Sequence, residues 1–253
     1  MATRRIKKSS LQTYQNQRRF IIGMVIILFV TTIFMFFLAY TQTEFAFLQT
    51  IVFIFLIGFV LLLFSLRQRM FSINMYLHYF RMIAEKQPPF SVTTVPLSPT
   101  FTEELIKDGF TKGIDRPSHQ IFFQYYRHLP FVKRTGQTMV WVILATHEEF
   151  NPYSEAIERD FEQIKLSLRQ TNQAINELTM VCRKLATWDE HQQEVMDRIV
   201  NFSLNNRAMV TIQFGQLPTN KVYALRPKRQ FPNKYYYAAM QIMFKLMGAK
   251  DVQ

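Results

Sequence analysis

Two long apolar segments near the N-terminus constrain this chain more than any other feature. Residues Phe20–Tyr40 and Phe45–Leu66 contain no charged side chain. A helix rises about 1.5 Å per residue, so each segment is long enough to cross the roughly 30 Å hydrocarbon core of a bilayer. Buried core helices and a cleaved signal peptide are the alternatives, and both fit two such segments in close succession poorly. The segments therefore predict a transmembrane helical hairpin.

Basic residues flank this hairpin, whereas the connection between the segments carries Glu44 and no cation. Because cations stay on the cytoplasmic side, we expect a multi-pass protein of the cell membrane with both termini in the cytoplasm. Neither segment contains an ionisable side chain, so we interpret the hairpin as an anchor, with an oligomeric pore as the alternative. Anionic lipid headgroups are the expected partner of the flanking cations. These cations are Arg4, Arg5, Lys7, Lys8, Arg18, Arg19, Arg67 and Arg69.

The composition divides the chain into four regions. They are a basic cytoplasmic tail (1–19), the hairpin (20–66), a membrane-proximal amphipathic helix (67–88) and a cytoplasmic domain (89–253). In the third region the polar residues recur at helical spacing on an otherwise apolar surface, at Asn74, His78, Arg81 and Glu85. Such a helix suits the headgroup interface or a continuation of the second span that packs on partners.

The cytoplasmic domain is predicted to be α+β, with a mainly antiparallel or mixed sheet of about four strands packed by long helices. The expected strands are Ser91–Val95, His119–Tyr126, Thr138–Ala145 and Arg207–Phe214. The second and third are joined by a short connection, which predicts antiparallel pairing. The third is almost wholly apolar, as expected of a central strand that is covered on both faces.

Capping signals and apolar spacing predict the helices. Thr100-x-x-Glu103 begins a helix that ends near Asp108, and Asn233 caps a last helix, Lys234–Met247, that Gly248 closes. From Ile157 to Leu185 apolar or neutral residues recur at alternating spacings of four and three. This pattern predicts one long helix, packed on the sheet or paired in a coiled coil. A further capping box, Thr187-x-x-Glu190, predicts a helix through about residue 204.

The expected element order is β-α-β-β-α-α-β-α. Without the extra helices it is the ferredoxin-like order. The alternative is a restriction-endonuclease-like core, α-β-β-β-α-β, if Val222–Leu225 supplies another strand.

No catalytic, cofactor-binding or metal-ligating residue is predicted. The glycines form neither G-x-G nor G-x-x-x-x-G-K, and the only cysteine, Cys182, excludes a zinc site with two thiolates. The two expected inner strands, Thr138–Ala145 and Arg207–Phe214, hold no acid for a metal-dependent nuclease. His147-Glu148-Glu149 follows a buried strand, which is where parallel α/β sheets bind ligands. Because we do not expect a parallel sheet, we interpret this cluster as a polar loop.

The C-terminal region interleaves cations with aromatic rings. Cations contact phosphates and rings stack on bases, so single-stranded nucleic acid is one expected ligand of this stretch. Anionic lipid or an acidic partner is the second interpretation, and a purely structural role is the third. The candidate binding residues are Lys221, Tyr223, Arg226, Lys228, Arg229, Lys234 and Tyr235.

The sequence favours a membrane-anchored, non-catalytic module that acts as a scaffold or interaction protein. Its expected partners are the bilayer and another protein or a second copy of itself. The alternatives are a membrane-tethered nucleic-acid-binding protein and a membrane-bound hydrolase or nuclease-like enzyme. The globular region carries 20 Lys and Arg against 16 Asp and Glu, so its charge alone does not indicate nucleic acid.

Overall fold

The computed structural model describes residues 2–41, 46–85, 87–133, 135–168, 175–198, 200–204, 207–227 and 233–249. The chain forms two compact units, Met1–Ala84 and Glu85–Gln253.

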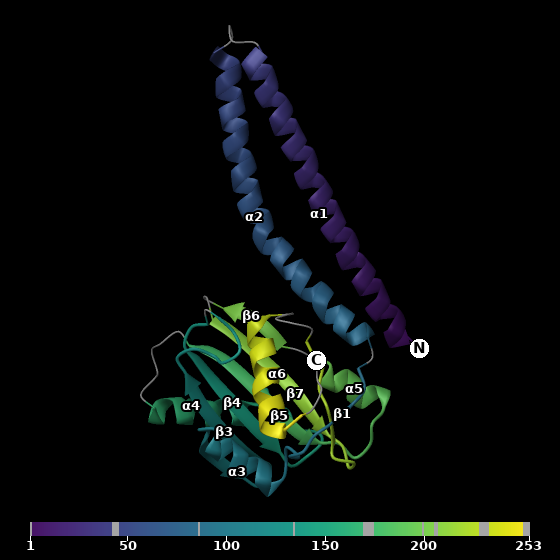
Figure 1. Ribbon diagram of the computed structural model, residues 1–253, viewed down its shortest axis with the longest axis vertical. Helices are drawn as coiled ribbons and strands as arrows, with labels where there is room; N and C mark the ends of the chain where they lie inside the picture. Colours follow the sequence, from purple (N-terminus) through teal and green to yellow (C-terminus); the bar gives the residue numbers. More distant parts are fainter. Residues whose placement is uncertain are drawn as a thin grey trace. The chain divides into compact units, whose positions relative to one another are not determined.

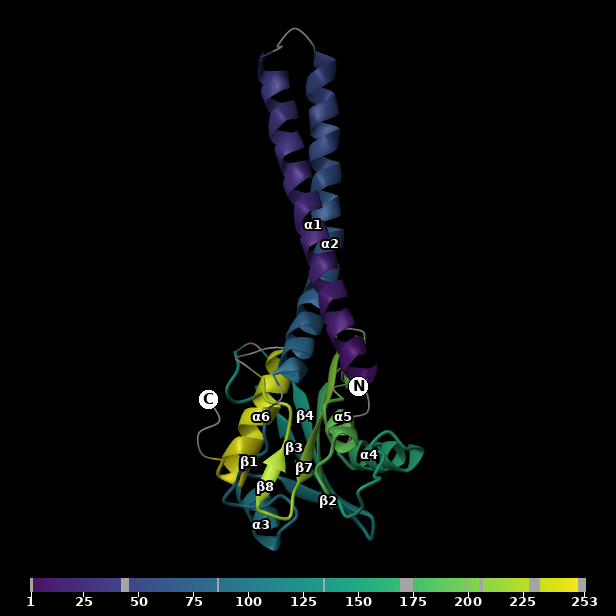
Figure 2. The same ribbon diagram turned by 90° about the vertical axis from the view of Figure 1, so that its right-hand side faces the viewer.

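The first unit is a pair of long helices, α1 (Ala2–Thr41) and α2 (Ala46–Ala84), which lie side by side (Figures 1 and 2). Both are long and apolar enough to cross a membrane, over Ser10–Thr41 and Thr50–Ala84. Large apolar side chains along them, such as Phe53, face outward and are exposed.

The predicted membrane-proximal segment is the last part of α2, so it continues the second apolar segment without a break. Its apolar surface packs in part on the first helix. The ring of Tyr14 stacks on Tyr76 at 5.2 Å and on Phe80 at 5.7 Å between centroids. Ile73 and Leu77 are buried together with Ile21 of α1. This packing extends the hairpin beyond the predicted spans.

The globular unit is built on a mixed β-sheet with the strand order β1-β8-β7-β5-β4-β3-β2, and β6 pairs with β7 beside this path (Figure 1). The strands are β1 (Phe90–Ser91), β2 (Thr111–Arg116), β3 (His119–Tyr126), β4 (Thr138–Ala145), β5 (Asn176–Lys184), β6 (Val200–Leu204), β7 (Arg207–Gln216) and β8 (Lys221–Tyr223). The central strands β4, β5 and β7 are parallel to one another, and the other pairs are antiparallel.

Helices cover both faces of this sheet (Figure 2). One face carries α3 (Pro99–Lys107) and α6 (Lys234–Met247), which form the larger core with Val140, Met180 and Ile212. The opposite face carries α4 (Glu155–Ser167), which packs on Trp141 and Ile143. The short helix α5 (Glu190–Met196) packs through Met196 beside Leu185 and Gly215 on this second face.

Several predicted elements are confirmed. The two strands β3 and β4 have the predicted bounds and the predicted antiparallel pairing, and β4 is buried along its whole length. The last helix also has the predicted bounds. The side chain of Asn233 accepts a hydrogen bond from the Tyr236 N–H, and Gly248 ends the helix at φ 57°.

The prediction of one long helix between Ile157 and Leu185 is wrong, and with it the coiled coil. The helix α4 ends at Ser167, and β5 then forms the centre of the sheet. Leu178, Met180 and Cys182 alternate onto the larger core, as strand geometry requires. The spacing of four between Leu178 and Cys182 suits a strand face as well as a helix face, which explains the error.

The predicted sheet of about four strands is too small, because β2, β5 and β6 were not expected. Neither predicted capping box is confirmed: Ser98 rather than Thr100 caps α3, and Asp189 rather than Thr187 caps α5. The helix α5 is also much shorter than predicted, since it ends at Met196 and β6 follows at Val200–Leu204. The ferredoxin-like order is therefore wrong. The run α3-β2-β3-β4-α4-β5 instead has the order α-β-β-β-α-β of the alternative topology.

Candidate functional site

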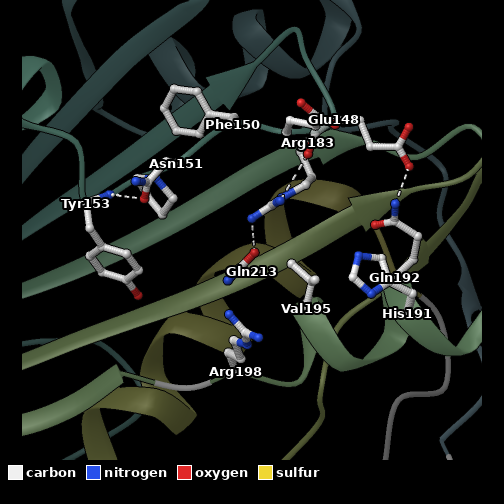
Figure 3. A pocket seen from close by; sticks show the side chains of 12 residues that line it. Glu148, Phe150, Asn151, Tyr153, Arg183, His191, Gln192, Val195, Arg198 and Gln213 are labelled. Carbon is white, nitrogen blue, oxygen red and sulfur yellow. Dashed lines mark hydrogen bonds between the residues drawn. The ribbon is translucent and has the colours of Figure 1, made fainter.

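A cavity of about 470 Å³ lies toward the carboxyl ends of the parallel strands β4, β5 and β7 (Figure 3). The loop from β4 to α4 forms one wall, and α5 forms another. The floor is made by side chains from the ends of β5 and β7. The lining residues are Glu148, Glu149, Phe150, Asn151, Pro152, Tyr153, Arg183, His191, Gln192, Val195, Arg198 and Gln213.

Arg183 lies at the floor of this cavity and is only 4% exposed. Its guanidinium donates to the backbone carbonyl of Glu148 over 3.1 Å and to the side-chain oxygen of Gln213. Its Nε is buried and has no hydrogen-bond partner among the residues that the structure describes. Both acceptors are neutral, so these hydrogen bonds orient the guanidinium without neutralising it.

The electrostatic position of Arg183 is unfavourable. Loss of water around the buried group lowers the pKa of Arg183, and the nearby Tyr153 and Glu148 oppose this shift. A guanidinium nevertheless stays protonated in proteins. Within the described part of the chain, no carboxylate lies at ion-pair distance from Arg183. The Glu148 carboxylate instead accepts a hydrogen bond from the Gln192 amide over 2.6 Å.

The walls of the cavity differ in character. In Figure 3, Tyr153 lies on one side of Arg183, and His191 and Gln192 lie on the other. Tyr153 is held by a turn in which its N–H donates to the Asn151 side chain over 3.0 Å. Loss of water around the phenol raises the pKa of Tyr153. His191 and Arg198 are exposed at the rim.

A second cavity of about 390 Å³ lies on the same face of the sheet and shares Pro152 and Tyr153 with the first. Apolar side chains from α4 and β7 line it, among them Ile157, Phe161 and Met209. The Lys165 ammonium and the Glu177 carboxylate form an ion pair of 2.7 Å in its lining.

A separate cluster of titratable groups surrounds Asp160 of α4. The Asp160 carboxylate accepts hydrogen bonds from the guanidinium of Arg116, with one bond of 2.8 Å, and lies 3.1 Å from Nε2 of His119. The other ring nitrogen of His119 lies 2.9 Å from the Ser118 hydroxyl. Serine, histidine and aspartate are thus linked, but Arg116 already neutralises the carboxylate. We interpret the cluster as a clamp between α4 and the β2–β3 hairpin.

Metal binding finds no support in the described residues, where no group of three or more His, Cys, Asp or Glu side chains could hold an ion.

The predicted basic-aromatic residues are spread over β8, the segment after it and α6. The ring of Tyr223 is buried, packs on Trp188 at 4.2 Å between centroids, and donates its hydroxyl to Asp197 over 2.5 Å. Lys221 is exposed at the start of β8. Lys234 lies over the ring of Tyr235, with 5.4 Å from Nζ to the centroid.

Arg226 is bound to the segment that precedes β1. Its guanidinium donates to the Pro88 carbonyl over 3.0 Å and lies over the Phe90 ring, and its backbone exchanges two hydrogen bonds with the Gln87 side chain. Lys228 and Arg229 lie outside the described residues. The structure therefore brings Lys234 and Tyr235 together but encloses Tyr223.

The membrane-flanking cations lie on the two long helices. Arg19, Arg67 and Arg69 are exposed, and Arg18 is half-buried. The side chains of the remaining four, Arg4, Arg5, Lys7 and Lys8, are outside the described ones.

Sequence reasoning missed Arg183 and Gln213, because the first was assigned to a helix and the second to an ordinary strand position. The His147–Glu149 cluster was the available signal. Glu148 and Glu149 line the cavity, whereas His147 is exposed and does not. The cluster was interpreted as a polar loop because a parallel sheet was not expected, but β4 pairs with β5, and β5 with β7, in parallel.

No family model, no curated protein and no solved structure matches this chain.

Proposed function

We propose that this chain is a membrane-anchored binding protein whose globular unit binds a small carboxylate-bearing ligand in the cavity at Arg183. The hairpin of α1 and α2 is the anchor, and the globular unit lies in the cytoplasm. The protein binds rather than catalyses, and it presents or senses its ligand at the membrane surface.

The buried, unneutralised guanidinium of Arg183 is the observation that carries this proposal. Burying an ion away from water is costly unless an opposite charge accompanies it. The neutral acceptors on Glu148 and Gln213 orient the group and leave its Nε unused. A carboxylate in the cavity would supply the missing charge, since planar guanidinium and carboxylate groups pair well.

The position of the cavity supports the same conclusion. Ligands of α/β sheets bind outside the carboxyl ends of parallel strands, because the loops that follow the strands converge there. A volume of about 470 Å³ is in the range of small-molecule sites.

The membrane anchor rests on the length and apolar character of both helices, together with the cations that flank them. Arg19, Arg67 and Arg69 are exposed and suit contact with anionic headgroups. The outward-facing apolar side chains of the hairpin suit lipid or a second membrane protein, including another copy of the chain.

The test compares the full chain in nanodiscs with its Arg183→Met variant. Acetate and succinate should raise the unfolding temperature of the unchanged protein at constant ionic strength, since a ligand that binds the native state stabilises it. Glycerol should not. The variant should lose the response to both anions.

A second readout separates a ligand-binding role from a structural one. Without anions, Arg183→Met should unfold at the same or a higher temperature, because replacing a buried ion by an apolar side chain is often neutral or stabilising. A large loss of stability would instead make Arg183 a structural clamp of the β4–α4 loop. The control variant Arg127→Met, at an exposed site that lines neither cavity, should keep the anion response.

A further inference from the structure

We infer that the ligand is a short peptide with a free C-terminal carboxylate, which lies along both cavities with that carboxylate at Arg183. This inference rests on the proposed function, since it assigns the ligand of the same site.

The floors of the two cavities follow one another along the same face of the sheet, as a strip in which several side chains are polar. Thr179 of β5 lies beside Thr211 of β7, and farther along Gln213 lies beside Val181. Thr179, Thr211 and Gln213 are each at most 8% exposed. The opposite face of the same strands is apolar, with Leu178 and Ile212 in the larger core. The oxygen of Gln213 already accepts a hydrogen bond from Arg183, whereas its amide NH2 and the hydroxyls of the two threonines are groups of the kind that hydrogen-bond peptide amides.

The length of the strip limits the ligand. Strands rise about 3.3 Å per residue, so the floor from Glu177 to Arg183 is about 20 Å long. An extended peptide covers at most about 3.5 Å per residue, so the strip accommodates up to about six residues.

The wall opposite the floor supplies apolar contacts. Ile157 and Phe161 of α4 line the second cavity, and Met209 of β7 adds an apolar side chain to its floor. Tyr153 contributes to both cavities and is 54% exposed, so its ring is available to the middle of a ligand that passes from one cavity to the other. These surfaces suit apolar peptide side chains.

The two cavities carry charged side chains of opposite sign. The first cavity has the unneutralised Arg183 at its floor. The second is lined by Glu158, Glu162 and Glu177 against the single cation Lys165, which already pairs with Glu177. The exposed carboxylates of Glu158 and Glu162 therefore remain for a positive group. A peptide with both termini free has the matching polarity, carboxylate at one end and ammonium at the other, whereas a fatty acid has only the first.

The test uses two synthetic tetrapeptide libraries, one of free acids and one of C-terminal amides. The full chain in zwitterionic nanodiscs is immobilised, and the retained peptides are identified by mass spectrometry. We expect enrichment from the free acids and little from the amides. For the best peptide, calorimetry should show that amidation weakens binding about tenfold or more, because a charge-assisted hydrogen bond is lost.

Variants connect this binding to the strip. Thr179→Val removes a floor hydroxyl at nearly constant volume and should weaken peptide binding about fivefold, in line with the loss of one hydrogen bond. Thr102→Val on α3 lies outside both cavities and is the matched control. N-acetylation of the peptide should weaken binding less than amidation does, since Glu158 and Glu162 are solvated.

The outcomes separate this inference from the proposed function. If acetate binds in a manner that depends on Arg183 but no free-acid peptide is enriched, the site takes a smaller carboxylate and the peptide inference is wrong. Equal affinity for acid and amide forms would also overturn it. If neither acetate nor any peptide responds to Arg183→Met, both the inference and the proposed function fail.

Discussion

Asp160 shows how one side chain joins two elements of the globular unit. It is 1% exposed on α4, and Arg116 and His119 hold it from the β2–β3 hairpin. The hydrogen bonds of Arg116 lower the pKa of the Asp160 carboxyl, burial opposes this, and His119 adds to the lowering. The ionised form is therefore the one that stabilises the fold.

The variant Asp160→Asn should lower the free energy of unfolding by about 2 kcal/mol at neutral pH, since charged hydrogen bonds are lost from a buried acceptor. The folded-state pKa is lowered, so this stabilisation is present above the unfolded pKa of about 3.9 and disappears as the pH falls through the folded value. Urea unfolding at neutral pH and below pH 4 should show the difference between the two proteins shrinking with acid.

The exposed Asp115 provides the control for this prediction. Lys112 and Gln120 hydrogen-bond it and lower the pKa of its carboxyl, but solvent screens the interaction. Asp115→Asn should leave stability nearly unchanged. If Asp160→Asn lowered the free energy of unfolding equally at neutral pH and below pH 4, the negative charge of Asp160 would not be what stabilises the contact between α4 and the β2–β3 hairpin.

At the level of single residues, the sequence predicted both caps of α6 but misplaced the N-caps of α3 and α5, and it predicted the candidate site poorly. Asn233 and Gly248 act within their own helix, so local spacing is enough to identify them. Arg183 acquires its role only because β5 lies between β4 and β7, which brings Glu148 and Gln213 to it. No local pattern carries that information, since these three residues are far apart in the chain.

Helices and strands could be predicted from the sequence where the apolar residues follow a single clear pattern. The continuous apolar run of β4 and the capped helix α6 are confirmed, because burial on both faces and helix capping leave clear patterns. The segment from α4 to β5 was not, since its apolar spacing suits a helix and a strand equally. Residues Asn176–Lys184 form a strand because β4 and β7 pair with their backbone on both sides.

The cap of α6 gives a prediction at this scale. Asn233→Ala removes the acceptor of the Tyr236 N–H, 2.7 Å away, and should lower the free energy of unfolding by about 1 kcal/mol. Asn233→Asp keeps an acceptor at the positive end of the helix and should unfold like the unchanged protein. If urea denaturation showed the same loss of unfolding free energy in both variants, the Asn233 amide would stabilise the protein by an interaction other than capping.

The whole molecule combines an apolar two-helix unit with a globular unit that carries its polar sites on one face of a mixed sheet. The proposed placement of the globular unit in the cytoplasm rests on charge alone. Cations flank both ends of the hairpin, and none lies in the connection at residues 41–44. The ligand proposed for the Arg183 cavity would then be a cytoplasmic one.

Thiol labelling tests this orientation, because Cys182 is the only cysteine and is buried. In a Cys182→Ala background, Thr43→Cys in the connection should react with a membrane-impermeant maleimide on intact cells. Glu103→Cys, at an exposed site on α3, should react only after lysis. The lysed sample shows that the reagent can reach this thiol. Labelling of Glu103→Cys on intact cells would place the Arg183 cavity outside, and its ligand would then have to be sought among extracellular carboxylates.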